Sequence, residues 1–236
     1  MSPLASTRLW TPAPASWRRR RAFVGGAFDP TSIAGLAFWV DAADASTITG
    51  SPDVSQWDDK SGNGRNLTQG TAGNQPDTGT RTQNGRNVID FDGTDDSMAT
   101  AAFTTNQPMT WFVVCLNDDG ADGTGQSAMG QQSATLVRFG KQTGNTWNLN
   151  AGSGLSLGTA DTAAHVFSVK INGVSSEIYV DGTSAGTGNA GANNVTTGMR
   201  VGAQGVTGAA FWDGWIAEAL IYDSVLSDAN RDAVLA

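Results

Sequence analysis

The stretch HVFSVKINGVSSEIYVD, residues 165–181, carries the clearest structural pattern in this chain of 236 residues. Apolar and polar residues alternate with a period of two from His165 to Ile171 and again from Ser176 to Val180. The pair Asn172-Gly173 between these runs is typical of a tight type I′ turn. This stretch therefore predicts a β-hairpin with one buried face.

Other short apolar runs, separated by Gly, Asn and Asp, predict further strands on both sides of this hairpin. The run Met109–Leu116 is apolar on both faces, which indicates a central strand covered on two sides. Ser227 precedes a short amphipathic stretch and is expected to cap a helix over residues 228–235. Residues 183–198 predict a long loop or a weak strand. The remaining predicted strands are Leu36–Val40, Arg86–Phe91, Thr135–Phe139, Thr146–Asn150, Met199–Gly202 and Trp215–Tyr222.

Charge divides the chain into two parts. Residues 1–28 contain five arginines and no acid, which leaves nine basic against 22 acidic residues in 29–236, so the parts carry +5 and −13. Thirty glycines and seven prolines fit an all-β protein rather than a helical one. We therefore predict an extended basic and aromatic arm over residues 1–28 and a two-sheet sandwich domain over residues 29–236.

Composition also excludes several classes of protein. The chain has no apolar run of the about 18 residues that a membrane helix needs, and no signal-peptide core follows the basic start. A single cysteine, Cys115, excludes an internal disulfide, and His165 is the only histidine. The acidic domain makes a nucleic-acid partner unfavourable. The homo-oligomeric state stays open, because no heptad segment specifies one.

The order and spacing of several motifs resemble the laminin G-like, concanavalin A-like lectin/glucanase superfamily, in the version found in tailed-phage virion proteins and bacterial surface proteins. The resemblance covers residues 33–236 and implies an all-β, two-sheet jelly-roll sandwich with a concave face. The motifs are GLAFWVDA (35–42), QWDDKSGNGRN (56–66), VIDFDG (88–93), IYVDG (178–182), WDGWIAE (212–218) and LIYD (220–223).

This resemblance leads us to expect a non-catalytic structural virion protein, such as a capsid decoration, head fibre or tail appendage, that displays a lectin-like domain at the virion surface. The arm would contact other virion proteins, because Trp and Arg are enriched at interface hot spots. A solvated tail or binding to nucleic acid or an anionic membrane surface are alternatives for the arm. The anchoring residues would be Trp10, Trp17, Arg18, Arg19, Arg20, Arg21 and Phe23.

Two alternative functions remain from the same resemblance: a carbohydrate-binding module of the bacterial cell surface, and a glycoside hydrolase. We expect no catalysis, because the two glutamates, Glu177 and Glu218, fall on separate strands and lack the paired spacing of glucanases. His165 is expected at the core edge in a hydrogen bond, Cys115 as a buried inert thiol, and Trp39, Trp111 and Trp215 in the core.

A glycan partner would need aromatic platforms beside amide or carboxylate groups. The candidates are three pairs, Trp57 with Asp58, Trp147 with Asn148, and Trp212 with Asp213. Calcium is the candidate cofactor, because Ca²⁺ binds hard oxygen ligands in acidic loops, although such acids are also common in ordinary turns. The candidate ligands are Asp92, Asp95 and Asp96, then Asp118, Asp119 and Asp122, with Asp58, Asp59 and Asn63 in a third loop.

Overall fold

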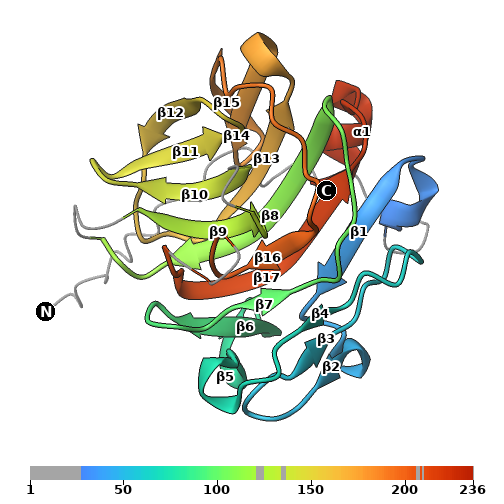
Figure 1. Cartoon of the computed structure of the whole chain (residues 1–236), viewed down its shortest axis with the longest axis vertical. Coiled ribbons are helices and arrows are strands. Elements are labelled where there is room, and N and C mark those ends of the chain that lie inside the picture. The colour runs from blue at the N-terminus through green and yellow to red at the C-terminus, as the bar shows by residue number, and fades with distance from the viewer. Residues whose placement is uncertain (1–27, 121–124, 134–136, 206–207, 209, 236) are drawn as a thin grey trace, which may run out of the picture.

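In a computed structural model, the chain forms a sandwich of two antiparallel sheets with one short C-terminal helix (Figure 1). The structure describes residues 28–120, 125–133, 137–205, 208 and 210–235. The prediction of an all-β, two-sheet sandwich with a short C-terminal helix is confirmed. The predicted arm lies outside the described residues except for Phe28, and the boundary after residue 28 stays a prediction.

Sheet A has eight strands, and β8 lies at its centre with β13 and β17 on its two sides. The first half of β17 pairs with β6, and its second half pairs with β1. The order across the sheet is β15 (Thr183–Gly188), β14 (Ser176–Val180), β13 (His165–Ile171), β8 (Met109–Asn117), β17 (Asp213–Tyr222), β6 (Arg86–Asp92) and β5 (Asp77–Gln83), with β1 (Leu36–Asp41) paired to β17.

Sheet B has nine strands and lies in front of sheet A in Figure 1. Its longer strands form one half, and strands of two or three residues form the other. The order is β12 (Gly154–Thr159), β11 (Thr146–Asn150), β10 (Arg138–Gln142), β9 (Gln126–Gln131), β16 (Met199–Val201), β7 (Met98–Ala99), β4 (Leu67–Thr68), β3 (Gln56–Trp57) and β2 (Ile48–Thr49).

The helical segments among the described residues are short. Ser227 caps the α-helix α1 (Asp228–Val234), since its hydroxyl accepts a hydrogen bond from the Asn230 amide at 3.2 Å. None of the helices in the described part of the chain has both the length and the apolar character to cross a bilayer. Four 3₁₀ turns complete the set: η2 (Pro30–Ser32), η3 (Ala45–Thr47), η4 (Ala72–Asn74) and η5 (Gly173–Ser175).

Aromatic rings fill the space between the two sheets. Trp147 of sheet B contacts Phe167 of sheet A, with ring centroids 4.6 Å apart, and Phe139 lies 4.8 Å from the same Phe167. These three side chains are at most 2% exposed. Since each such ring removes a large apolar area from water, about 1.5–3 kcal/mol per side chain, this packing holds the two sheets together.

A second, smaller cluster lies on the outer face of sheet A. It is built on Phe112, Leu220 and Tyr222, which point away from sheet B, and α1 contributes Val234 to it. The Tyr222 hydroxyl donates to the Pro30 carbonyl at 3.0 Å, which ties the start of the described chain to this face. The C-terminal segment therefore covers part of the outer face of sheet A.

The predicted hairpin forms, but its turn differs from the predicted type I′. Asn172 has φ −152°, and the connection runs through η5 instead. The Ser176 hydroxyl accepts from the Asn172 amide, and the Gln107 side chain accepts from the Gly173 amide, so tertiary contacts select the longer turn. A two-residue turn with both φ angles positive follows at Asp181-Gly182, between β14 and β15.

Replacing Phe167 by alanine should lower the free energy of unfolding by about 3–5 kcal/mol, because its ring joins the two sheets and the cavity left behind cannot collapse. Urea unfolding followed by tryptophan fluorescence measures this. The matched control is Val174→Ala, since Val174 is 76% exposed and should change stability by less than about 0.5 kcal/mol. A loss below about 1 kcal/mol for Phe167→Ala would contradict this account of the core.

Candidate functional site

The three tryptophans predicted as glycan platforms are buried, so that prediction is wrong. Trp57 and Trp212 are 0% exposed and Trp147 is 2% exposed. Stacking on a sugar requires an accessible ring face, which none of the three provides. Trp147 packs on Phe167, and the Trp212 indole donates to the Leu116 carbonyl at 3.1 Å. These three large rings fill space in the hydrophobic core between the two sheets.

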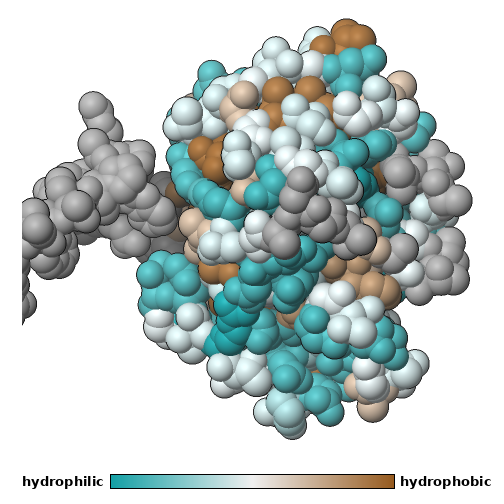
Figure 2. Space-filling model, turned by 90° about the vertical axis from the view of Figure 1, so that its left-hand side faces the viewer, coloured by the Kyte–Doolittle hydropathy of each residue, from teal (hydrophilic) through white to brown (hydrophobic). Residues whose placement is uncertain are grey.

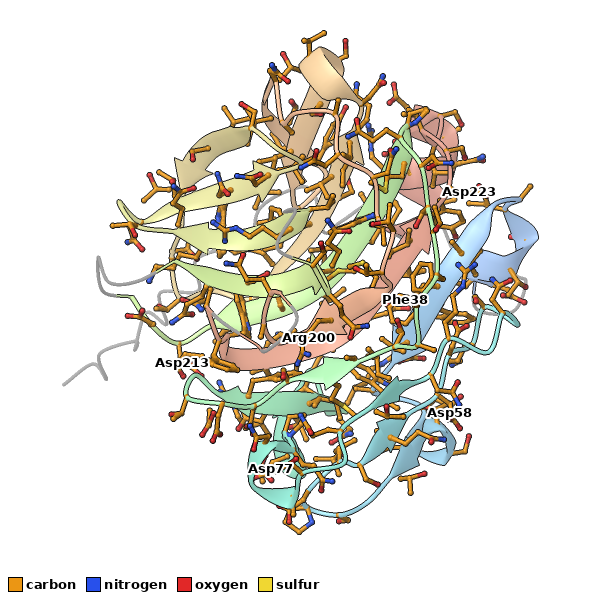
Figure 3. All side chains as sticks on the ribbon, in the orientation of Figure 1. Phe38, Asp58, Asp77, Arg200, Asp213 and Asp223 are labelled. Carbon is orange, nitrogen blue, oxygen red and sulfur yellow. The ribbon has the colours of Figure 1, made fainter. Side chains whose placement is uncertain are left out.

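The polar neighbours of these tryptophans also lie apart. Asn148 is fully buried in β11, where its amide donates to the Ser156 hydroxyl at 3.0 Å. Asp58 accepts from the Gln56 amide at 2.7 Å. Figure 3 shows Asp58 and Asp213 on opposite sides of the view. These residues therefore do not form one binding surface.

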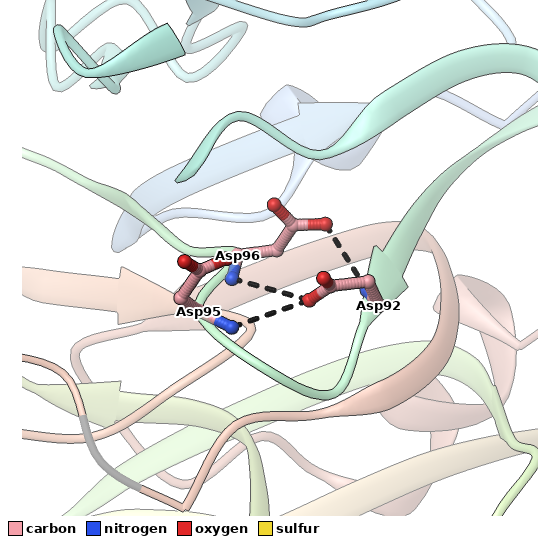
Figure 4. Close-up of side chains that lie close together, drawn as sticks. All are labelled: Asp92, Asp95 and Asp96. Carbon is pink, nitrogen blue, oxygen red and sulfur yellow. Dashed lines mark hydrogen bonds between the residues drawn. The ribbon is translucent and has the colours of Figure 1, made fainter. Parts of the chain in front are cut away.

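The predicted loop after β6 does bring three carboxylates together (Figure 4). One oxygen from each of Asp92, Asp95 and Asp96 lies within 4.8 Å of the others. Asp92 accepts from the backbone amides of Thr94, Asp95 and Asp96, and Asp96 accepts from the Asp92 amide at 3.0 Å. These hydrogen bonds fold the loop, and calcium at this place stays a prediction.

Two further acidic loops are occupied by hydrogen bonds and ion pairs. Asp118 pairs with Arg81 of β5, and Asp119 lies 3.3 Å from the buried Lys141 ammonium. In the loop after β3, the Asp59 carboxylate accepts from the amides of Trp39, Ser61 and Arg65 and so holds the loop against β1. The carboxylates of Asp118, Asp119 and Asp59 are therefore engaged by basic side chains or backbone amides of the protein itself. Asp122 lies outside the described residues.

The loops after β6 and β8, but not the loop after β3, lie beside Asp213 at the start of β17. Burial raises the pKa of Asp213, and the neighbouring charges of Asp118, Asp119 and Asp92 raise it further. Burial likewise raises the pKa of Asp96 to about 7, with Asp92 and Asp95 adding to the effect against a backbone hydrogen bond. This acidic end combines residues distant in sequence, which no local pattern indicated.

The single histidine and the single cysteine occupy structural positions, as predicted. His165 Nδ1 lies 2.8 Å from Asp181, and Nε2 lies 2.9 Å from Asp161. Burial lowers the pKa of His165, but the two carboxylates outweigh it and the net change is upward. Cys115 is 1% exposed, and burial raises the pKa of its thiol.

Trp111 and Trp215 lie in the core as predicted, but Trp39 does not. Trp39 is only half-buried on the outer face of sheet A, where its indole donates to Glu218 at 2.8 Å and the Lys60 ammonium lies 4.5 Å from the ring centroid. The β1 strand pairs only with the second half of β17. The Trp39 ring lies at the border of the outer hydrophobic cluster and is only partly covered.

The two glutamates lie too far apart to act as a glycosidase pair. Glu177 belongs to β14 and Glu218 to β17, with β13 and β8 between them. Three strand spacings of about 4.8 Å give a lateral separation of about 14 Å. Glycosidase carboxyls lie about 5–9.5 Å apart. Glu177 is also held by Lys170 at 3.1 Å and by Ser184 at 2.7 Å.

A small pocket opens on the outer face of sheet A beside α1. Its floor is formed by outward-facing side chains of neighbouring strands, Thr110 of β8, Ser168 and Lys170 of β13, and Tyr179 of β14. Arg231 of α1 borders the pocket, and its guanidinium lies 4.1 Å from the centroid of the Tyr179 ring. The cavity volume is about 70 Å³.

Sequence reasoning missed this pocket, although part of the signal was present. The alternation in β13 places Ser168 and Lys170 on the face opposite Phe167 and Val169, and α1 was predicted. Docking of the helix against that face depends on the contacts of Val234 and Leu235 with the outer cluster. No pattern in the chain indicates where a terminal helix will pack.

No protein-family model matches the chain, and no curated protein does. Among solved structures, it is similar to a Trypanosoma rangeli sialidase in complex with sialic acid, with 15% identity and a TM-score of 0.61. That match covers 89% of this chain but 34% of the sialidase, so the chain spans about a third of that protein.

Two other solved structures have a similar fold. Domain 4 of AbnA, an extracellular arabinanase of family GH43 from Geobacillus stearothermophilus in complex with arabinotriose, matches with 11% identity and a TM-score of 0.60 over 84% of this chain and 97% of that domain. The binding domain of botulinum neurotoxin serotype G matches with 9% identity and a TM-score of 0.58 over 85% of this chain and 50% of that one. These likenesses show the fold.

The predicted role as a structural virion protein is wrong. The neighbours are sialidases, an arabinanase domain and a toxin binding domain, and they give a virion role no support. The motifs that suggested a virion belong to strands and turns that many sandwich proteins need, so they indicate fold rather than role. The anchoring residues assigned to that role, from Trp10 to Phe23, lie outside the described residues.

Asp96→Asn should flatten the pH dependence of stability. The folded chain holds a proton on Asp96 up to about pH 7, whereas an unfolded aspartate releases it near 3.8. The folded state therefore binds more protons between these values, and stability falls as pH rises through this window. Three pKa units correspond to an upper bound of about 4 kcal/mol. Urea unfolding in EDTA at pH 4.5 and pH 8 measures the difference. An unchanged pH dependence in the variant would contradict the assignment.

If calcium binds the loop that carries Asp92, Asp95 and Asp96, the melting temperature should depend on the metal. Adding 1 mM Ca²⁺ at pH 8 should raise Tm by about 2–5 °C, since bound metal stabilises only the folded chain, and EDTA should reverse the rise. Asp95→Asn should abolish it, because it removes one of the three oxygen ligands. The control is Asp232→Asn in α1. If Tm were equal with Ca²⁺ and with EDTA, the prediction that this protein binds calcium would be wrong.

Proposed function

We propose that this chain is a non-catalytic carbohydrate-binding module. The observation that carries the proposal is the likeness to the arabinanase domain, because it spans nearly all of a single domain whose structure was determined with a bound trisaccharide. The sialidase likeness is weaker support, since it spans only about a third of that protein. The partner would be a glycan, in keeping with the alternative left open by the sequence.

The arrangement of acids supports a binding role over hydrolysis. The described residues place Glu177 and Glu218 about 14 Å apart across sheet A. A retaining or inverting mechanism needs a closer pair. Burial raises the pKa of Glu218, but its carboxylate is engaged by the Trp39 indole. The single histidine is held between two carboxylates at the core edge.

The character of the surface agrees with a saccharide partner. The face seen in Figure 2 is mostly hydrophilic, with hydrophobic residues scattered among polar ones. Sugars present hydroxyl edges that exchange hydrogen bonds with such side chains, and small CH faces that contact single apolar groups. The largest aromatic rings are used in the core, so recognition would depend on polar groups and few apolar contacts.

Isothermal titration of the full chain with a panel of saccharides tests the proposal. The panel contains arabinotriose, xylotriose, cellotriose, maltotriose and 3′-sialyllactose. At least one should bind with Kd on the order of 0.1 mM, an affinity of about −5.5 kcal/mol. The chain unfolded in urea serves as the negative control. Absence of binding on the panel and on a glycan array would refute a carbohydrate-binding function.

The same panel tests the absence of catalysis. Incubation with the folded chain should release no reducing sugar above the buffer rate. Reproducible turnover that Glu218→Gln abolishes would contradict the non-catalytic proposal, since this residue would then act as one of the two carboxyls. Turnover that persists in Glu218→Gln and in Glu177→Gln would point to a contaminating hydrolase.

A further inference from the structure

We infer that the pocket beside α1 receives a hydroxyl or hydroxymethyl group of an uncharged sugar. This inference rests on the proposed carbohydrate-binding function and names the place and the chemical class of the ligand. The pocket lies between the outward face of β8, β13 and β14 and the C-terminal segment that ends in α1. Its residues all belong to the described part of the chain.

Ser168 supplies the unused hydrogen-bonding group. Its side chain is 1% exposed, lines the pocket, and has an Oγ without a hydrogen-bond partner among the described residues. Its neighbours across the strands are Tyr179 on β14 and Phe112 on β8. Since a buried hydroxyl without a partner is unfavourable, the pocket suits a ligand that can both donate and accept a hydrogen bond at this point.

The charged groups around the pocket are already paired with one another. The Lys170 ammonium contacts Glu177 at 3.1 Å, and the Arg231 guanidinium contacts Asp228 and Asp232, each at 2.8 Å. An anionic ligand would have to compete with these carboxylates, and a cationic ligand would have to compete with Lys170 and Arg231. The balance of charge therefore favours a neutral ligand over a carboxylate, a phosphate or an amine.

The Thr110 hydroxyl is also engaged, which leaves Ser168 as the open position on the floor. Thr110 donates to the Ser224 carbonyl at 2.8 Å and accepts from the Leu226 amide at 3.1 Å. These bonds hold the segment before α1 against β8. The wall of the pocket is thereby fixed next to Ser168, which also lines it.

Size decides how much of a ligand enters. The cavity volume of about 70 Å³ is several times the about 10–15 Å³ that one water molecule needs, so the pocket has room for a small polar group. Val225 borders the pocket and is 39% exposed, with Leu226 beside it, so apolar groups stand at the opening. One hydroxyl-bearing arm would enter while a CH face of the ring lies over these two side chains.

Titration of two pocket variants with whichever panel saccharide binds the native chain tests the inference. Ser168→Ala removes the hydroxyl without adding bulk, and Val225→Phe adds bulk at the opening. Each should weaken binding at least about fivefold, the effect of one lost hydrogen bond or of one blocked contact. Ser153→Ala, in an exposed turn between β11 and β12, is the matched control and should leave Kd unchanged.

The outcomes separate this inference from the proposed function. Equal Kd values for the native chain and both folded pocket variants would overturn the pocket while carbohydrate binding stands. Tighter binding of 3′-sialyllactose than of any neutral trisaccharide would overturn the neutral-ligand assignment. Failure of the whole panel to bind the native chain would overturn the proposed function and the pocket with it. Thermal melts verify folding, and chemical-shift changes of the Val225 and Leu226 methyl groups in the native chain give a readout that needs no variant.

Discussion

Contact between the aromatic rings of Trp147, Phe139 and Phe167 is the interaction on which the rest of the structure depends. It joins β10 and β11 of sheet B to β13 of sheet A, and each ring is removed almost completely from water. The remaining strands extend this core on both sides, with β8 buried on nearly its whole length. The loops, the acidic end and the pocket beside α1 are positioned by two sheets whose separation these rings determine.

Because the large aromatic rings lie in the core, few of them are available at the surface to bind a ligand. Trp57, Trp147 and Trp212 are closed to solvent, so a glycan has no broad tryptophan platform at these positions. Polar residues on the outer faces of the sheets are what remains for binding. Ser168 differs from most of them, because it is buried and has no hydrogen-bond partner within the part of the chain that the structure describes, beside a pocket bordered by the C-terminal segment.

Repulsion between the acidic side chains of the domain is reduced in two different ways. At Arg81 and Lys141, basic side chains from β5 and β10 neutralise the acids of the turn after β8. At the loop after β6 the carboxylates accept from backbone amides, and burial raises the pKa of Asp96 to about 7 although its backbone hydrogen bond lowers it. Repulsion within this loop is a cost to stability that protonation relieves, and that a cation would relieve as well.

The sequence by itself indicated several strands, above all β8, β13 and β14, and the capped terminal helix, because period-two burial and Ser227 capping are local properties. It also indicated that Cys115 would be buried and that the glutamates would lie apart. Only the tertiary structure decided that Trp57, Trp147 and Trp212 face the core and that two of the acidic loops lie beside Asp213. It also decided that α1 closes a pocket over Ser168. These outcomes depend on which surfaces meet when two sheets and a helix pack, and contacts between residues far apart in sequence leave no pattern along the chain.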